Sequence, residues 1–334
     1  MSSAALTAIQ TQINVYGYPI LLIFGTIGNI LIVILFKKYN QNACAIYILS
    51  AAIANGIYVT VIAFFQIFPF YYEDESTRAF ILCKFRYYIT NTIGQITRTM
   101  LILSCIDRYL ITSNRPSFRT LSTPKRAVWA IIISIIIWPI LASHIAIMNT
   151  IEKGKCNSYG VYTTVYSLYV IVFICTLPPI VLGIFGYLTY SHMRQLHLRI
   201  QPSTQDRTIN TSVRIRRQDR DLLVIVLAEI VVYVITNLPY ALIFVEILIS
   251  QYAVPNKSAL YSQIESFIRI VSTILLLMNN SAPFYIFLAT SKSFRRDFQQ
   301  LTINSYRMLT GKPPNQIVST TDHTKTMTHR DIHF

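Results

Sequence analysis

The sequence predicts an all-α integral membrane protein, a seven-transmembrane helix bundle, and its composition and hydropathy pattern carry that prediction. The chain has 334 residues, of which 53% are hydrophobic and only 13% are charged, whereas a soluble domain carries about 25% charge. Its apolar residues form runs that reach the roughly 20 residues an α-helix needs to cross a bilayer. Transmembrane β-strands would be about 9 to 11 residues long with alternating polarity. A helical bundle therefore remains, and a soluble enzyme or a nucleic-acid binder is disfavoured.

Seven apolar runs follow one another along the chain. The four runs that contain no charged residue cover 16–36, 43–72, 127–151 and 159–190. Three further runs reach the same length if a few charges are allowed, and they cover 85–111, 222–249 and 260–290.

The net charge of +15 is explained by its distribution along the chain. Twenty of the 29 Lys and Arg residues lie after the first, third, fifth and seventh runs, whereas four lie in the segments of the other side. By the positive-inside rule the crowded side is cytoplasmic, so the N-terminus is outside and the C-terminus inside. The charge is thus a topology signal and argues against a nucleic-acid partner. We expect a short extracellular N-terminus over 1–15, the helix bundle over 16–290, an amphipathic helix on the inner leaflet over 291–311 and a disordered cytoplasmic tail over 312–334.

Two of the five cysteines are extracellular in this topology. Cys83 starts the third run and Cys156 follows the fourth, while the other three lie within apolar runs. Because disulfides persist outside the cell, we expect a Cys83–Cys156 bridge, with two unrelated thiols as the alternative. Asn256 begins the sequon Asn256-Lys257-Ser258 on the same side and is the expected glycosylation acceptor.

The third run ends in Asp107-Arg108-Tyr109, an acidic and basic pair at the inner face. Arg108 follows Cys83 by 25 positions, about 37 Å along a helix. One helix therefore carries the disulfide at its outer end and this charged pair at its inner end.

That combination resembles the rhodopsin-like (class A) G-protein-coupled receptors over nearly the whole chain, from Gly25 to Phe298. The Asp107-Arg108-Tyr109 motif of this family is intact. Other residues match the family in register, namely Gly28, Asn29, Leu49, Ala52, Trp129, Pro179, Tyr187 and Pro239. Asp219 lies 20 residues before Pro239, where many members carry an acid that pairs with the arginine of the motif.

Several positions depart from the family pattern. Asn55 replaces the usual aspartate of the second span, so we expect no sodium ion there. The sixth-span motif reads Thr236-Asn237-Leu238-Pro239 without its tryptophan, and Tyr285 follows Pro283 one residue too early. The roles of Asn237 and Tyr285 are therefore carried over only as expectations.

The resemblance implies a plasma-membrane, multi-pass receptor that binds an extracellular ligand and activates a heterotrimeric G protein by moving helix six. It implies no enzymatic activity and no cofactor or metal. A receptor kinase and arrestin are further expected partners, through the hydroxyl-rich tail, and membrane lipid through the amphipathic helix. The residues expected to serve coupling and activation are Asp107, Arg108, Tyr109, Asp219, Tyr187, Pro239, Pro283 and Tyr285.

The ligand class is predicted by exclusion. Amine receptors of this family carry Asp 18 residues before the motif arginine, where this chain has Thr90, and retinal-binding members need a Lys that 270–291 lacks. A peptide is favoured, since the acidic run Glu73-Asp74-Glu75 and Glu246 suit a basic or amidated peptide, while lipids and other small molecules stay open. The expected pocket comprises Tyr87, Thr90, Asn91, Gly94, Asn237, Tyr240, Glu246, Glu265 and Arg269.

Four ionisable residues of the predicted spans are placed where ion pairs are expected. Arg98 and Glu229 lie at similar depth in spans three and six, so we expect them to form an ion pair that neutralises both, unless each faces a water-filled cavity separately. Glu265 and Arg269 are four residues apart, which favours a local salt bridge over a ligand role. Paired charges at mid-membrane also suit a small-solute transporter or channel, the alternative function, although the chain shows no internal repeat.

Overall fold

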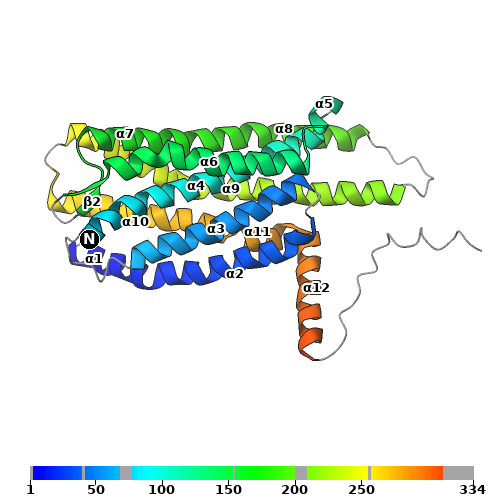
Figure 1. Ribbon diagram of the computed structural model, residues 1–334, viewed down its shortest axis with the longest axis horizontal. Coiled ribbons are helices and arrows are strands. Elements are labelled where there is room, and N and C mark those ends of the chain that lie inside the picture. The colour runs from blue at the N-terminus through cyan, green and yellow to red at the C-terminus, as the bar shows by residue number, and fades with distance from the viewer. Residues whose placement is uncertain are drawn as a thin grey trace, which may run out of the picture.

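The computed structural model describes residues 3–39, 42–67, 77–113, 115–152, 155–199, 209–254 and 257–310. Its long helices run alongside one another in a bundle, and one helix is set across the end (Figure 1). The expected glycosylation acceptor Asn256, the acidic run 73–75 and the tail 312–334 lie outside the described residues.

The first helical stretch is longer than the sequence indicated. The helix α1 (Ser3–Gln12) continues through the π-helical segment η1 (Ile13–Gly17) into α2 (Tyr18–Phe36). Pro19 stands at the start of α2 and has no N–H to donate, and π-helical turns are typical of such interruptions. The helix therefore begins at Ser3 and not at residue 16, and Gln263 donates a hydrogen bond of 2.7 Å to Thr7 Oγ1 that ties α1 to α10 (Ala259–Ser281).

The next three long helices are α3 (Ala43–Ile67), α4 (Thr77–Thr112) and α6 (Pro124–Met148). The short turn η2 (Lys37–Tyr39) lies between α2 and α3, and α5 (Pro116–Arg119) lies between α4 and α6. In the described part of the chain, six helices are long and apolar enough to cross a membrane. The helix α4 is the seventh member of the bundle in Figure 1, and its charged residues are what set it apart from the others.

The second half of the bundle contains two interrupted helices and one very long one. The fifth span consists of α7 (Val161–Val170), the π-helical η4 (Ile171–Thr176) and α8 (Leu177–Arg199). The helix α9 (Ile209–Ala253) has 45 residues, about 67 Å at the usual rise, and extends beyond its neighbours in Figure 1. The seventh span breaks at Ala282 between α10 and α11 (Pro283–Thr290).

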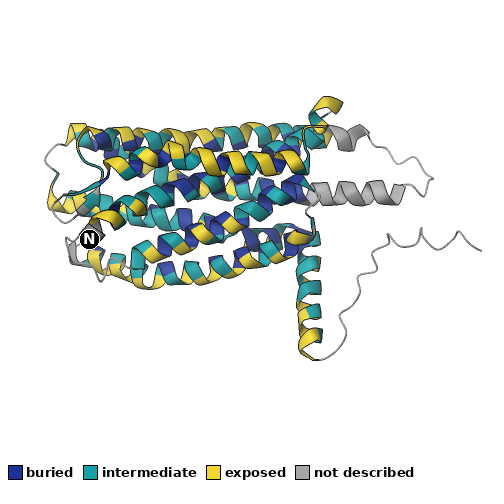
Figure 2. Cartoon of the chain, in the orientation of Figure 1, coloured by how far each residue is buried: buried dark blue, intermediate teal, exposed yellow. Residues whose placement is uncertain are grey.

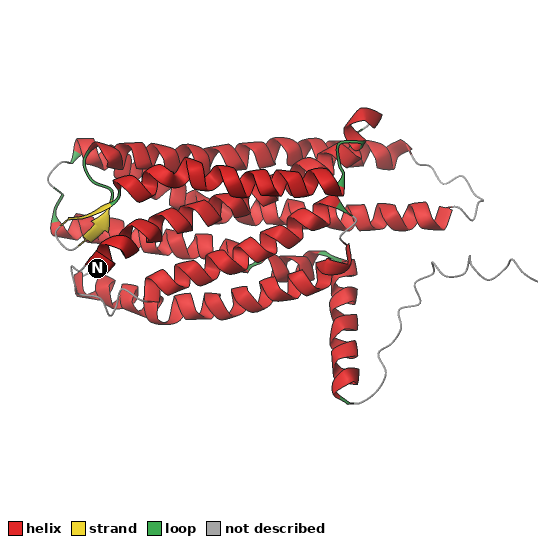
Figure 3. Ribbon diagram, viewed as in Figure 1, coloured by secondary structure: helices red, strands yellow, loops and turns green. Residues whose placement is uncertain are grey.

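The two ends of the bundle are finished differently. At one end, strands β1 (Thr150–Glu152) and β2 (Lys155–Asn157) pair antiparallel (Figure 3). At the other end, α12 (Lys292–Leu309) lies across the bundle, and Tyr306 and Met308 expose 67% and 66% of their surface. The order of elements agrees with the seven predicted spans, and α12 follows them as a further helix.

Exposed apolar side chains cover the outside of the bundle. Ile140 and Ile147 of α6 are both 67% exposed, and Figure 2 shows exposed residues along the outward faces of the helices. The interior instead contains polar side chains, including Asn29, Gln95 and Ser272, each at most 2% exposed. This arrangement is stable in a bilayer, because hydrocarbon replaces water around the bundle and polar groups satisfy one another inside.

Candidate functional site

The C-terminal end of α4 holds a buried arginine in place. Arg108 is 1% exposed and its Nη2 lies 2.6 Å from Asp107 Oδ2. The same nitrogen donates a hydrogen bond of 3.1 Å to Asn42 Oδ1. Ser122 donates a hydrogen bond to the other carboxylate oxygen of Asp107. Two successive residues of one helix thus connect α4 to the segment before α3 and to the loop after α5.

Asn42 is a functional candidate that the sequence interpretation missed. Its Oδ1 accepts hydrogen bonds from the backbone N–H groups of Cys44 at 3.0 Å and Ala45 at 3.4 Å, so it caps the N-terminus of α3. Asparagine just before an apolar helix is a recognisable capping signal. What the signal does not reveal is that the same oxygen also accepts from Arg108.

The neighbouring Tyr109 packs against α8. Its ring centroid lies 5.4 Å from that of Phe185 and 5.5 Å from that of His192. Tyr187, which was expected to serve coupling, is 71% exposed. The α8 face that carries Phe185 and Leu182 meets α4, so Tyr187 is turned away from Arg108 in this conformation, and its coupling role stays a prediction.

A small polar cavity of about 40 Å³ lies in the middle of the bundle. It is large enough for one or a few water molecules. Its polar lining comes from four helices and consists of Tyr47, Asn55, Thr97, Arg98, Ser104, Glu229, Tyr233, Asn237, Asn279 and Asn280.

Arg98 and Glu229 both line this cavity, but the expected ion pair between them is not formed. The Arg98 guanidinium and the Tyr58 ring both lie beside Gly94. A Cβ atom on Gly94 would lie 2.9 Å from Arg98 Nη1, so this glycine makes room for the side chain to fold back over its own helix. Equal depth in the membrane therefore placed the two charges in one cavity without bringing them into contact.

The break in the seventh span is compensated by α2. Pro283 has no N–H, and α10 ends just before it, which leaves backbone carbonyls without helical partners. Asn29 donates a hydrogen bond of 3.1 Å to the Asn280 carbonyl across the helix interface. The Tyr285 side chain of α11 also contacts α2, where its hydroxyl donates a hydrogen bond of 3.2 Å to the Phe24 carbonyl, and Tyr285 is 40% exposed. One position along a helix is a rotation of about 100°, which explains why this early tyrosine points to α2 and Ile286 lines the cavity instead.

The disulfide between Cys83 and Cys156 is present and connects α4 to β2. Tyr87, one turn along α4, donates a hydrogen bond of 3.2 Å to the Cys156 carbonyl. Asn91 and Gln95 then donate to the hydroxyls of Tyr166 at 3.1 Å and Tyr169 at 3.3 Å. Successive turns of α4 are thus attached to the hairpin and to α7, and Thr90 and Gly94 lie on the adjoining strip of the same helix.

Aromatic side chains of α9 face this strip from across the bundle. The rings of Tyr240 and Phe244 are 4.8 Å apart, and Phe244 packs at 6.1 Å against Tyr166 of α7. Asn237, one turn further in, donates a hydrogen bond of 2.8 Å to the Tyr233 carbonyl. The structure therefore brings the expected pocket residues of α4 and α9 together with the tyrosines of α7, which the sequence interpretation did not assign.

The charged residues at the outer ends of α9 and α10 are paired differently from the expectation. Glu265 forms its salt bridge with Lys257, and not with Arg269 four residues later. The cause is local, because Lys257 lies just before the helix and reaches the first carboxylate of α10. Glu246 accepts a hydrogen bond from the Tyr261 hydroxyl.

The remaining expected activation residues have defined positions in the backbone. Pro239 lies inside α9, where it leaves the carbonyl four residues earlier without a helical donor. Asp219 belongs to the first part of α9, and its side chain lies outside the described side chains, so its pairing with Arg108 stays a prediction.

Comparisons with known proteins agree with this geometry. Residues 28–282 match the family described as 7 transmembrane receptor (rhodopsin family). The chain is also similar to the C-C chemokine receptor type 6 of Homo sapiens, with 31% identity over 157 residues. That similarity covers 43% of this chain and 38% of the human receptor, so it spans well under half of the relative's length.

Proposed function

Because the chain belongs to the rhodopsin family of seven-transmembrane receptors, we propose that it binds an extracellular peptide and activates a heterotrimeric G protein. Members of this family are receptors and not enzymes, and they are multi-pass proteins of the plasma membrane. Beyond membership of this family, the proposal specifies the class of ligand, the coupling partner and the helix that moves.

The observation that carries the coupling proposal is the restrained arginine at the inner end of α4. Arg108 is almost completely buried and is held by Asp107 and Asn42. A buried charge that is kept by short polar contacts can be released only if neighbouring helices move, which makes it a two-state element. Outward movement of the inner half of α9 about Pro239 would uncover Arg108 for a helix of the Gα subunit.

Charge supports the location of this interface. By the positive-inside rule the end of the bundle that carries α12 faces the cytoplasm. The start of α9 belongs to that end and contributes Arg214, Arg216, Arg217 and Arg220. Membrane lipid of the inner leaflet is the proposed partner of α12, whereas arrestin and a receptor kinase are the proposed partners of the tail.

A peptide ligand is supported by two observations. The relative is named as a chemokine receptor, and the outer half of the bundle presents tyrosines and charged residues from α4, α7, α9 and α10. Such amphipathic side chains contribute large contact areas together with hydrogen bonds, as in other peptide-binding surfaces.

The test is nucleotide exchange without a known ligand. Membranes that contain the receptor at increasing density are mixed with purified G proteins of the stimulatory, inhibitory and phospholipase-activating classes, and binding of a non-hydrolysable GTP analogue is measured. Basal exchange should rise with receptor density for at least one class. Arg108→Ala should abolish this rise at equal surface expression, while Arg307→Ala on α12 serves as a control that keeps it. An unchanged rise in Arg108→Ala would refute the coupling proposal.

A further inference from the structure

The outer end of α10 carries a cation without a partner. At this end Lys84 donates to the Ile147 carbonyl, Arg86 donates to Gln66, and Lys257 pairs with Glu265. Arg269 differs from them, because within the described part of the chain its guanidinium makes no hydrogen bond or ion pair and only its backbone carbonyl is used, by Thr273. An arginine carries five donors, so this arrangement leaves all of them for solvent or a ligand.

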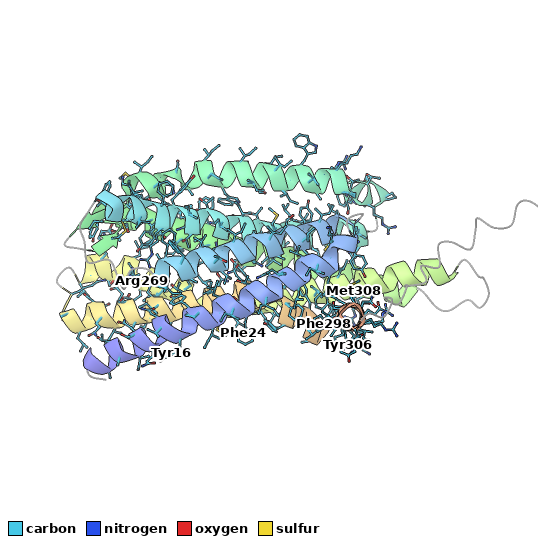
Figure 4. All side chains as sticks on the ribbon, turned by 60° about the horizontal axis from the view of Figure 1, so that its bottom comes forward. Tyr16, Phe24, Arg269, Phe298, Tyr306 and Met308 are labelled. Atoms are coloured by element: carbon cyan, nitrogen blue, oxygen red, sulfur yellow. A yellow bond between two sulfur atoms is a disulfide. The ribbon has the colours of Figure 1, made fainter. Side chains whose placement is uncertain are left out.

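The position of Arg269 on α10 directs it to the inside of the bundle. Leu276 and Asn280 follow Arg269 by seven and 11 positions, and such spacings differ in direction by only about 20° from Arg269. Both are buried, with 4% and 8% of their surface exposed, and both line the central cavity. Arg269 thus continues the same inward stripe toward the extracellular end, and Figure 4 shows it at the end of the bundle opposite α12.

A second charged group at this end is half satisfied. One carboxylate oxygen of Glu246 accepts from Tyr261, while the other, Oε2, is buried and has no hydrogen-bond partner among the residues that the structure describes. Tyr261 precedes Arg269 by eight positions, so their backbones are about 12 Å apart along α10, and Glu246 contacts the one nearer the outer rim. An extended peptide covers this length in about four residues.

We propose that the ligand is a short peptide that enters with its C-terminus first, so that its terminal carboxylate binds Arg269 and the basic side chain of about the fourth residue from the C-terminus binds Glu246. The inference rests on the proposed receptor function and specifies its ligand. A guanidinium matches a carboxylate in a bidentate geometry that is stronger than a neutral hydrogen bond. An amidated C-terminus lacks this charge, so the free acid and not the amide is the expected form.

The first test uses synthetic hexapeptide pools that carry Arg or Lys at the fourth position from the C-terminus and are made both as free acids and as amides. G-protein nucleotide exchange is the readout. The free-acid pools should stimulate nucleotide exchange, and amidation of the peptides should lower their potency at least tenfold. Arg269→Gln should lower free-acid potency at least tenfold and should make amidation inconsequential, because both changes remove the same contact. Lys257→Gln, whose cation is already paired, is the matched control and should change potency less than threefold.

The second test needs no agonist and no G protein. Thr273→Cys places a thiol one turn below Arg269, and its rate of modification is measured with the anionic ethylsulfonate and the cationic trimethylammonium-ethyl methanethiosulfonates, against the receptor without this cysteine. The ratio of anionic to cationic rates should fall at least threefold when Arg269→Gln is added.

The outcomes separate this inference from the receptor function. Activity confined to amidated pools, silence of every free-acid pool, or a rate ratio that Arg269→Gln leaves unchanged would overturn the inference. Activation by oleate or lysophosphatidic acid in the absence of peptide activity would assign the anion to a lipid and also overturn it. In each of these cases, if basal nucleotide exchange still depends on Arg108, the proposed receptor function remains supported although the ligand inference fails.

Discussion

Replacing Asn42 by alanine should raise ligand-independent signalling, because it removes an anchor of Arg108. The Asn42 side chain accepts from Arg108 Nη2 at 3.1 Å and from two backbone N–H groups of α3. The two roles respond differently to the substitution. The helix cap is expected whether the receptor is open or closed, whereas in the proposed coupling mechanism the contact with Arg108 belongs to the closed conformation.

The size of the effect follows from these contacts. A hydrogen bond to a charged group contributes about 1.5 to 3 kcal/mol, so its loss from the closed state alone shifts the ratio of open to closed receptor roughly 10- to 150-fold. A receptor with about 1% in the open state would then reach roughly 10 to 60%. Loss of the cap costs about 1 kcal/mol in both states, which lowers thermal stability and leaves the ratio unchanged.

The assay is basal nucleotide exchange at matched surface expression, with thermal unfolding measured in parallel. Asn42→Asp is the control, because a carboxylate keeps both the cap and the contact with Arg108, and its basal exchange should equal that of the wild type or lie below it. Basal exchange of Asn42→Ala within twofold of the wild type would refute the reasoning. An equal rise in Asn42→Asp would also contradict it, since the acceptor would then be irrelevant.

Three further predictions concern the interior of the bundle. Gly94→Ala should lower the free energy of unfolding by about 1 to 3 kcal/mol, because its Cβ would lie 2.9 Å from Arg98 Nη1. Gly56→Ala is the control and should be tolerated, since its Cβ would lie 3.8 Å from the nearest atom. Equal melting temperatures of the two variants would contradict this prediction. Asp219→Ala should raise basal exchange by removing the expected partner of Arg108 on α9, and unchanged or lower exchange would count against that pairing. Basal exchange should change less than twofold when sodium is replaced by N-methylglucamine at constant ionic strength, because Arg98 lies beside the cavity and repels a cation; a tenfold change would sink this expectation.

The span order and the disulfide could be predicted from sequence for a physical reason. A run of 20 apolar residues has essentially one low-energy structure in hydrocarbon, the helix that satisfies its own backbone. Charge asymmetry then orients the spans, and orientation puts Cys83 and Cys156 on the same side. Each step depends on position along the chain and not on packing.

Contacts that depend on the rotation of a helix could not be predicted in this way. Spacing gave Arg98 and Glu229 the same depth, but Arg98 folds back over α4 into the room that Gly94 leaves beside Tyr58. The same limitation explains Arg269, whose expected partner is one helical turn away and is bound by a lysine from the preceding loop instead.

The distribution of polar contacts indicates which helix stays and which moves. The helix α4 is attached to its surroundings along its whole length, by the Cys83–Cys156 disulfide, by Asn91 and Gln95 to tyrosines of α7, and by Arg108 to Asn42. Movement of α4 would break all of these contacts together. The helix α9 instead contains an interior proline and extends beyond the bundle at its inner end. Displacing the part of α9 that precedes Pro239 leaves every one of the α4 contacts to the hairpin and to α7 intact, which supports the proposed bend of α9 against a stationary α4.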